Sequence, residues 1–335
     1  AHNGNLTNAD QLKIEMFKND RRHINTDSDS EVLLNVLAHE IQQSTSSISL
    51  DPSTLFSALA ALHKRVRGSY AVVAHVAGYG LLAFRDPYGI RPLCIGRIDT
   101  PQGPEWMVAS ESVALEGLGF TFVRDVNPGE AIYIDLDGNF YARQCVPNAV
   151  LTPCIFEYVY LARPDTTIAG QSIHAVRGRI GQRLAIEAPV DADLVIPVPE
   201  SGTPAAIGYA KQSGIPYGLG LVKNSYVGRT FIQPSQTIRQ LGIRLKLNPL
   251  REIIEGKRII VVDDSIVRGN TQRALVRMLR EAGALEIHVR ISSPPVKWPC
   301  FYGIDFATRA ELIASGLEVE EIRRSIGADS LAYVS

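Results

Sequence analysis

Two adjacent acidic residues, Asp263 and Asp264, follow an apolar run and precede the sequence Ser-Ile-Val-Arg-Gly-Asn-Thr of residues 265–271. Apolar residues at helical spacing come next, so the pattern predicts a buried strand, a short turn and a helix. The backbone N–H groups of residues 267–271, with the two hydroxyl side chains of this turn, could hold a phosphate, because the N-terminus of a helix favours an anion.

The two carboxylates would repel a bare phosphate, so they are expected to face something else. Ribose hydroxyls and a Mg²⁺ ion are the two candidates, since Mg²⁺ prefers oxygen ligands. The alternative is a structural interpretation, in which the two acids end a strand and cap the next helix. The seven residues that follow the acids favour a binding site.

A second turn, Glu-Ser-Gly-Thr at residues 200–203, follows a shorter apolar run at 194–198. Its backbone N–H groups would suit a diphosphate, although a generic turn would have a similar composition. Between the two turns, residues 223–258 hold eight basic and two acidic side chains. A polyanion would bind to this excess of positive charge. A solvated surface and a nucleic-acid patch are the alternatives, and the scarcity of aromatic residues disfavours nucleic acid.

The elements that must position these loops change in type along the chain. Helical patterns at 32–41 and 55–66 precede six short strand-like runs between residues 69 and 145, which predicts an α+β domain. After that, strand-like runs at 194–198, 217–222, 258–262 and 287–291 alternate with helical patterns, which predicts an α/β domain with a mostly parallel, doubly wound sheet. We therefore expect two domains, residues 1–148 and 149–335, in agreement with the length of 335 residues.

Composition argues against several classes of protein. With 34 basic and 35 acidic residues the formal net charge is −1, so no overall field attracts nucleic acid or an anionic membrane. The most apolar stretch, residues 70–84, is too short to span a bilayer. Four widely spaced cysteines without a CxxC pair do not indicate a disulfide scaffold and favour a reducing cytoplasm. The seven histidines form no pair at metal-ligand spacing.

Residues 261–271 resemble the phosphoribosyl pyrophosphate (PRPP) signature of type I phosphoribosyltransferases, and the form Asp-Ser-Ile-Val-Arg-Gly is similar to that of the amidophosphoribosyltransferase family. Six further segments resemble that family and occur in its order: residues 1–5, 85–93, 109–112, 128–130, 156–165 and 299–305. The resemblance covers nearly the whole chain. It implies an N-terminal nucleophile hydrolase-like α+β domain, incomplete here, followed by a type I phosphoribosyltransferase α/β domain.

The resemblance also implies roles for residues of the transferase half. The PRPP-binding residues would be Asp263, Asp264, Ser265, Ile266, Val267, Arg268, Gly269, Asn270 and Thr271. The pyrophosphate loop would be Glu200, Ser201, Gly202 and Thr203, and a Mg²⁺ site would involve Ser201, Asp263 and Asp264. A mobile lid, about residues 223–250, would include Lys223, Tyr226, Arg229 and Thr230.

For the first half of the chain, the resemblance implies glutamine hydrolysis. In this family an N-terminal Cys attacks the glutamine amide. The chain begins with Ala1, so we expect the nucleophile upstream and no glutaminase activity from the sequence as written. Asn3 and Gly4 match the family's oxyanion hole, and Asp29 matches the residue that binds the glutamine α-amino group. Taken alone, Asn3-Gly4 would indicate a turn and Asp29 a helix N-cap.

Two cysteines match a further feature of one branch of the family. In the branch that carries an iron–sulfur cluster, Cys154 and Cys300 match two of the four thiolate ligands. The resemblance thus implies one 4Fe–4S cluster, with the other two ligands expected beyond Ser335. The alternative is that both are buried free thiols that pack as small apolar groups.

The activity implied by the resemblance is that of a pentosyltransferase: glutamine-dependent transfer of ammonia to C1 of PRPP, giving 5-phosphoribosylamine, glutamate and pyrophosphate, the first committed step of purine synthesis. The partners would be PRPP, glutamine and inhibitory purine nucleotides, with a cytoplasmic homo-oligomer that is a tetramer in the family. Two alternatives are a salvage phosphoribosyltransferase, a class without the glutaminase-like half, and a nucleotide-sensing regulatory protein on the same fold. Retention of both loops and the basic segment favours an enzyme.

Overall fold

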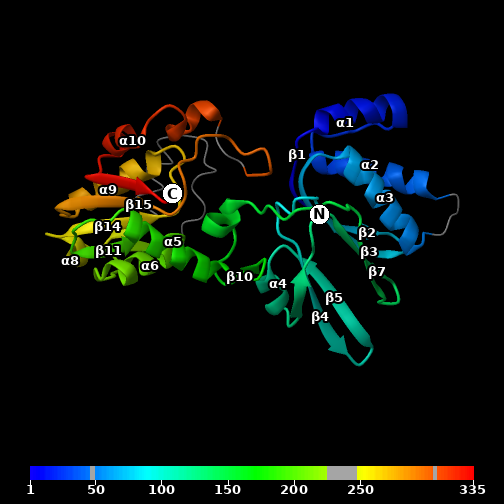
Figure 1. Ribbon diagram of the computed structural model, residues 1–335, viewed down its shortest axis with the longest axis horizontal. Coiled ribbons are helices and arrows are strands. Elements are labelled where there is room, and N and C mark those ends of the chain that lie inside the picture. The colour runs from blue at the N-terminus through cyan, green and yellow to red at the C-terminus, as the bar shows by residue number, and fades with distance from the viewer. Residues whose placement is uncertain (46–49, 225–246, 305–307) are drawn as a thin grey trace. The chain divides into compact units, whose positions relative to one another are not determined.

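The computed structural model describes residues 1–45, 50–224, 247–304 and 308–335. The chain forms two compact units, each described by itself, and Figure 1 labels most of their helices and strands. The first unit comprises Ala1–Glu157, Asp165–Gly170 and Cys300–Asp305. The second comprises Tyr158–Pro164, Gln171–Pro299 and Phe306–Ser335.

The first unit is built on an antiparallel sheet with the strand order β1-β2-β3-β7-β8. Its strands are β1 (His2–Leu6), β2 (Gly68–Val76), β3 (Gly80–Arg85), β7 (Glu130–Asp135) and β8 (Phe140–Gln144). β1 lies at one edge and pairs with β2, with Asn3 opposite Ala71 and Gly4 opposite Tyr70. Among the described residues, β1 therefore pairs with another strand along one edge only.

Helices pack against one face of this sheet. They are α1 (Ala9–Glu15), a π-helical turn (Met16–Asp20), α2 (Asp29–Ser44) and α3 (Pro52–Arg65). α3 begins where the Asp51 side chain accepts a hydrogen bond from the N–H of Thr54 at 2.7 Å, with Pro52 in the first turn. The apolar side chains of α2 and α3 share a core with Val72, Leu82 and Phe84 of the sheet.

A second, smaller sheet covers the opposite face. Its order is β5-β4-β6, with β4 (Cys94–Thr100), β5 (Gly103–Ala109) and β6 (Thr121–Asp125). The short helix α4 (Ser112–Glu116) and the strand β9 (Thr167–Ile168) also belong to this unit. Ala71, Ala83 and Ile132 pack with Ile95 on this side, whereas their sequence neighbours face the helices, as the two-residue period of a strand requires. The predicted α+β class is confirmed.

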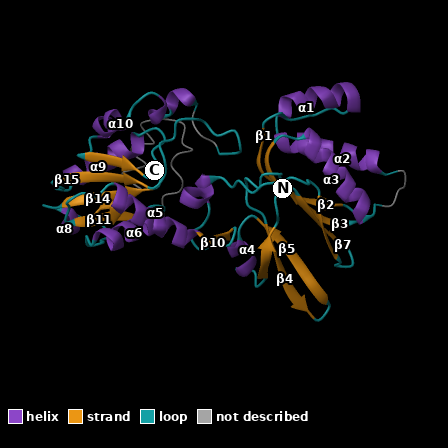
Figure 2. Ribbon diagram, viewed as in Figure 1, coloured by secondary structure: helices purple, strands orange, loops and turns teal. Residues whose placement is uncertain are grey.

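The second unit contains a parallel sheet of four strands in the order β11-β14-β15-β16. They are β11 (Leu194–Pro197), β14 (Arg258–Asp263), β15 (Glu286–Ile291) and β16 (Ser330–Tyr333). Helices cover both of its faces, as Figure 2 shows: α5 (Ile173–Glu187) and α6 (Thr203–Ser213) on one side, and α9 (Asn270–Glu281) and α10 (Val319–Ile326) on the other. The predicted α/β class is confirmed.

The central strand β14 shows why this sheet needs two helical layers. Ile260 and Val262 pack on the α5–α6 side, and Ile259 and Val261 pack on the α9–α10 side. All four side chains are fully buried. A strand that is apolar on both faces is stable only when both faces are covered, so the sequence of β14 dictates the layering.

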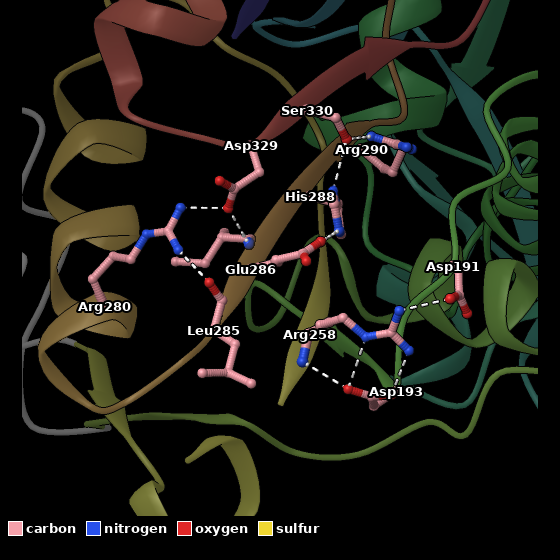
Figure 3. Close-up of polar contacts among 11 residues, drawn as sticks. Asp191, Asp193, Arg258, Arg280, Leu285, Glu286, His288, Arg290, Asp329 and Ser330 are labelled. Carbon is pink, nitrogen blue, oxygen red and sulfur yellow. Dashed lines mark hydrogen bonds and ion pairs between the residues drawn. The ribbon is translucent and has the colours of Figure 1, made fainter. Parts of the chain in front are cut away.

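The amino ends of these strands are held by ion pairs (Figure 3). Arg258, the first residue of β14, donates to Asp191 at 2.6 Å and to Asp193 at 2.8 Å. Arg280 of α9 pairs with Asp329, which also accepts from the N–H of Ile287 at 2.7 Å. These contacts fix the sheet at the end opposite to the loops at 200–203 and 263–271, which follow the carboxyl ends of β11 and β14.

Smaller elements complete the second unit: β10 (Gln171–Ser172), β12 (Leu221–Lys223), β13 (Leu247–Pro249), α8 (Arg251–Ile254) and the 3₁₀ turns Arg309–Glu311 and Ile313–Ser315. A further π-helical turn spans Glu157–Leu161. The strand expected at 217–222 is largely wrong, because Tyr217 forms only an isolated bridge and Gly218 and Gly220 interrupt the run. No helix within the described ranges is long and apolar enough to cross a membrane.

Candidate functional site

Asp263 and Asp264 lie at the carboxyl end of β14 with both side chains buried. Asp263 accepts hydrogen bonds from the backbone N–H of Asp264 at 2.9 Å and from the side-chain amide of Gln272 on α9. Asp264 accepts from the hydroxyl of Ser265 at 2.5 Å, and the Ser201 side chain lies close enough to lower the pKa of Asp264. The structure thus brings the two carboxylates against the loop that contains Ser201.

The environment of the pair favours its protonated form. Burial raises the pKa of Asp263 well above its ordinary value, and the charge of Asp264 raises it further. Burial also raises the pKa of Asp264, against which the hydroxyls of Ser201 and Ser265 and the charge of Arg177 act in the opposite direction. A cation or sugar hydroxyls placed against the carboxylates would stabilise the charged form.

The loop at 200–203 is pressed onto the end of β14. A Cβ atom at Gly202 would lie 2.3 Å from the carbonyl oxygen of Val262, so only glycine fits there. The loop also follows β11 directly, where the N–H of Val198 donates to the carbonyl of Val262 at 2.9 Å. Helix α6 begins at Thr203, and its first N–H groups, which lack helical partners, lie next to the loop.

The nine residues of the 263–271 segment differ in what their side chains do. Ile266 is buried in the core. Arg268 is exposed and forms an ion pair with Glu311 at 3.0 Å. Gly269 has a φ of 75° at the start of α9, and a Cβ atom there would lie 2.7 Å from the side chain of Ile313. The backbone N–H groups of this turn are therefore the groups best placed to meet a phosphate.

The basic segment is only partly described. Lys223 forms an ion pair with Glu200 at 3.1 Å, next to the 200–203 loop. Tyr226, Arg229 and Thr230, which the resemblance assigns to the lid, lie outside the described residues. The prediction that the basic excess of residues 223–258 binds a polyanion does not extend to Arg258. Arg258 is neutralised by Asp191 and Asp193 at the amino end of the sheet, because it begins β14 whereas the loops follow the strand ends.

The acidic pair meets part of the needs of a Mg²⁺ ion. It offers two carboxylates and a neighbouring hydroxyl, all of which are oxygen ligands. In the part of the chain that the structure describes, no group of three or more His, Cys, Asp or Glu side chains could hold a metal ion. A Mg²⁺ ion here would therefore complete its coordination with substrate oxygens and water, as is usual at phosphate sites.

The first unit brings Asn3, Gly4 and Asp29 into one region. Asn3 and Gly4 lie on the edge strand β1, and the carboxylate of Asp29 accepts a hydrogen bond from the N–H of Leu6 at 3.0 Å. Asn3 also donates to the hydroxyl of Ser110 at 3.4 Å. The N-cap of α2 is Ser28 and not Asp29, so the capping alternative for Asp29 is wrong. The turn alternative for Asn3-Gly4 is also wrong, because both residues belong to β1.

Cys154 and Cys300 both belong to the first unit and lie close enough for their charges to interact. The N–H of Tyr302 donates to the sulfur of Cys300 at 3.3 Å. Burial raises the pKa of Cys154. All four cysteines are free, and burial raises the pKa of Cys94 to about 12 and that of Cys145 to about 11, as expected of thiols that only pack.

Comparisons with known proteins match both halves of the chain. Residues 1–117 match a glutamine amidotransferase domain, and residues 169–292 match a phosphoribosyl transferase domain. The amidophosphoribosyltransferase of Escherichia coli (strain K12) is 49% identical over 339 residues, which cover 99% of this chain and 67% of that protein. The chain belongs to the amidophosphoribosyltransferase family.

Other family members agree with this assignment. The amidophosphoribosyltransferase of Mycobacterium tuberculosis (strain ATCC 25618 / H37Rv) is 58% identical over the whole chain, which spans 62% of that relative's length. The glutamine PRPP amidotransferase from B. subtilis, complexed with ADP and GMP, has a TM-score of 0.87 and 46% sequence identity, over 100% of this chain and 70% of that one. The chain therefore spans about three-fifths of the first of these two relatives.

Two side chains near the acidic pair of this family member are not predicted from its sequence. Gln272 hydrogen bonds to Asp263, and the charge of Arg177 on α5 acts on Asp264. Gln272 could have been found, because it follows the 265–271 turn directly and lies in the first turn of the expected helix. Arg177 has no such signal, since no helix is predicted where α5 lies.

Proposed function

We propose that the protein transfers ammonia derived from glutamine to C1 of PRPP, with release of pyrophosphate, and so catalyses the first committed step of purine synthesis. The observation that carries this proposal is the meeting of the Asp263–Asp264 pair with the 200–203 loop at the carboxyl ends of adjacent parallel strands. Ligands of open α/β sheets bind at this edge. The amidotransferase names of the relatives support the same reaction.

In the transferase half, Asp263 and Asp264 would accept hydrogen bonds from the ribose hydroxyls or hold a Mg²⁺ ion together with Ser201. Such an ion would neutralise charge on the pyrophosphate as it leaves. The backbone N–H groups of residues 267–271 would bind the 5-phosphate, and those of the 200–203 loop would bind the pyrophosphate. Lys223, Tyr226, Arg229 and Thr230 remain the proposed lid residues.

In the glutaminase half, the side-chain amide of Asn3 and the N–H of Gly4 would stabilise the oxyanion of the tetrahedral intermediate. Asp29 would bind the α-amino group of glutamine. Support comes from the placement of all three residues on β1 and the adjacent start of α2. The match of residues 1–117 to a glutamine amidotransferase domain supports the same assignment.

Cys154 and Cys300 would supply two of the four thiolates of a 4Fe–4S cluster. Their proximity and the N–H donated to the Cys300 sulfur fit such a site, because hydrogen bonds to the sulfurs are a regular feature of these clusters. A cluster needs two further ligands, which the described residues do not identify. Iron and sulfide analysis of anaerobically purified protein tests this assignment, and absence of both would leave two half-buried free thiols.

Further parts of the proposal concern organisation. The domain limits would be 1–148 for the glutamine amidotransferase domain and 149–335 for the transferase domain. The protein would act in the cytoplasm as a homo-oligomer, which light scattering of the purified protein can test. Purine nucleotides would be inhibitors, which the ADP and GMP of the B. subtilis structure support.

The decisive experiment measures phosphoribosylamine formation from PRPP, Mg²⁺ and ammonium by the full-length protein. The Asp263→Asn/Asp264→Asn variant is measured beside it, with Asp99→Asn, an exposed residue of β4, as the matched control. We expect turnover by the wild type and the control and loss of turnover in the double variant. Binding of PRPP without any pyrophosphate release would instead favour a nucleotide-sensing protein on the same fold.

A further inference from the structure

Arg91 is a buried guanidinium that joins distant segments of the first unit. Its side chain is about 5% exposed. One terminal nitrogen, Nη1, donates to the carboxylate of Glu157 at 2.7 Å, and Nε donates to the carbonyl of Tyr302 at 3.2 Å. The planar fork of arginine can reach two acceptors in fixed directions at once, which a lysine ammonium on a flexible stem does less well.

Both partners of Arg91 lie beside the cysteines discussed above. Glu157 follows Cys154 by one turn, with the N–H of Glu157 bonded to the carbonyl of Cys154 at 3.1 Å. Tyr302 follows Cys300, and its N–H donates to the Cys300 sulfur. The N–H of Cys154 itself donates to the carbonyl of Ile90, next to Arg91, at 3.3 Å. Arg91 therefore fixes the Cys154 segment and the Cys300 segment relative to each other.

The Cys300 segment is also seated on the sheet that contains β1. The carbonyl of Tyr302 accepts a second hydrogen bond, from the hydroxyl of Ser69 at 3.0 Å, and Asn5 donates to the carbonyl of Phe301 at 2.9 Å. Gly303 lies against Gly4: a Cβ atom at Gly303 would be 2.7 Å from the carbonyl carbon of Gly4. A shift of residues 300–303 would therefore displace the backbone of Gly4.

Stability alone does not account for the ion pair, because a buried pair gains little over apolar packing. A better account is that it fixes a unique arrangement. The loop that presents Arg91 is itself rigid: Arg85 donates to the carbonyls of Arg91, Gly89 and Val126 at 2.7–2.8 Å. Both the backbone of Arg91 and its guanidinium are consequently fixed by hydrogen bonds.

We propose that Arg91 is a positioning residue that couples the Cys154–Cys300 pair to the oxyanion strand β1. Through Glu157 it sets the spacing of the two cysteine segments, and through Tyr302 it presses residues 300–303 onto Gly4. This inference rests on the glutaminase role proposed for Asn3 and Gly4 and on the cluster role proposed for the cysteines. The inference adds that the positions of the two sites depend on each other through the side chain of Arg91.

The test uses Arg91→Gln in the full-length protein, purified anaerobically, with Arg97→Gln as the matched control because Arg97 is an exposed arginine paired with Asp99 in the same unit. We expect Arg91→Gln to retain less iron and sulfide, and its amides at residues 300–304 and 2–6 to exchange hydrogen faster. Glutamine-dependent kcat should fall about tenfold while ammonium-dependent kcat is unchanged, since a small misplacement of catalytic groups has effects of this size. Arg97→Gln should match the wild type in every measurement.

Milder variants keep the inference falsifiable if Arg91→Gln fails to fold. Ser69→Ala removes only the second hydrogen bond to Tyr302 and should reproduce the faster exchange and the selective loss of glutamine-dependent activity, to a smaller degree. Arg91→Lys keeps the charge beside Glu157 and should restore iron content more than it restores glutamine-dependent kcat. Equal losses with glutamine and ammonium, or unchanged exchange at residues 2–6 in the Ser69 and Arg91 variants, would overturn the coupling. A wild type without either activity would instead refute the proposed function.

Discussion

The candidate sites of the two units are assembled from different kinds of chain segment. In the second unit, the site consists of two loops that directly follow neighbouring parallel strands, and each loop is one short run of sequence. In the first unit, it consists of β1, the start of α2 and the 300–303 segment, which are far apart in the chain. The site of the second unit is therefore encoded in local motifs, whereas the residues of the first unit's site come together only when the chain folds.

The two candidate sites also differ in their chemistry. The second unit buries a pair of carboxylates, whose raised pKa values make the site responsive to cations and hydroxyl donors. The first unit offers backbone N–H groups on an edge strand, which suit an oxyanion. Each candidate site nevertheless contains one glycine that lies against a neighbouring carbonyl, Gly202 in the second unit and Gly4 in the first. Substituting these two glycines is the sharpest way to separate the sites.

Gly202→Ala has the largest expected effect. The glycine has an ordinary φ of −76°, but the added methyl group would lie 2.3 Å from the carbonyl oxygen of Val262, so the 200–203 loop must move away from the acidic pair. We expect transfer to PRPP to fall about thousandfold with either glutamine or ammonium, because both rely on preorganised donors to the pyrophosphate. Steady-state assays of the full-length protein with each nitrogen source measure the activities of this variant and the next. Gly316→Ala, with no atom within 4 Å of the new methyl group, should keep full activity, and an active Gly202→Ala would contradict the assignment of the loop.

Gly4→Ala should impair only one of the two activities. Its methyl group would lie 2.0 Å from the carbonyl oxygen of Ser69, and its φ of 140° is unfavourable for alanine. We expect glutamine-dependent transfer to fall about hundredfold, the usual effect of losing an oxyanion donor, while ammonium-dependent transfer stays at the wild-type level. Gly103→Ala shares a positive φ of 121° but has open space around it, so it controls for backbone strain. Equal loss of both activities would show that the units are not separable in this way.

The contrast between the sites also explains what the sequence could reveal. The acidic pair, the 200–203 loop and both fold classes could be predicted, because they depend on short runs and on the periods of strands and helices. Arg91 could not, since its partners Glu157 and Tyr302 are 66 and 211 residues away in sequence. The strand expected at 217–222 failed for the opposite reason: the local apolar pattern was present, but two glycines and a single bridge did not sustain pairing.

One titratable group in each unit, His63 in the first and Asp263 in the second, has a pKa shifted by burial, and the two shifts give opposite pH responses. His63 of α3 is half-buried, with Nε2 shielded from solvent and the ring bonded to the hydroxyl of Tyr70 at 2.7 Å, and this loss of hydration lowers its pKa from 6.5 to about 4. Below pH 6.5 the unfolded chain binds a proton there and the folded one does not, so acidification to pH 4 should cost about 3 kcal/mol of the free energy of unfolding. Asp263 acts in reverse: its raised pKa favours the folded state at low pH and opposes it as pH rises.

Denaturant unfolding at several pH values, with each unit followed by hydrogen exchange, tests this difference. Relative to the wild type, His63→Phe should gain stability in the first unit as the pH falls from 6.5 to 4. Tyr70→Phe, which keeps the imidazole, should show the wild-type dependence. Asp263→Asn should gain stability in the second unit as the pH rises. The same pH dependence in His63→Phe and the wild type would show that His63 is not held in its neutral form.

Arg268→Gln has the smallest expected effect and asks which part of the 263–271 turn would bind the phosphate. Its side chain is exposed and paired with Glu311, so its loss should change the free energy of unfolding by less than about 1 kcal/mol. If the turn acts through backbone N–H groups, the KM for PRPP should rise only about threefold, through weaker long-range attraction. Glu311→Gln breaks the same ion pair without altering the turn, and it should lower this KM slightly because Arg268 is released. A loss in Arg268→Gln as large as that of Gly202→Ala would show that the second site, like the first, depends on a side chain whose role its local sequence does not reveal.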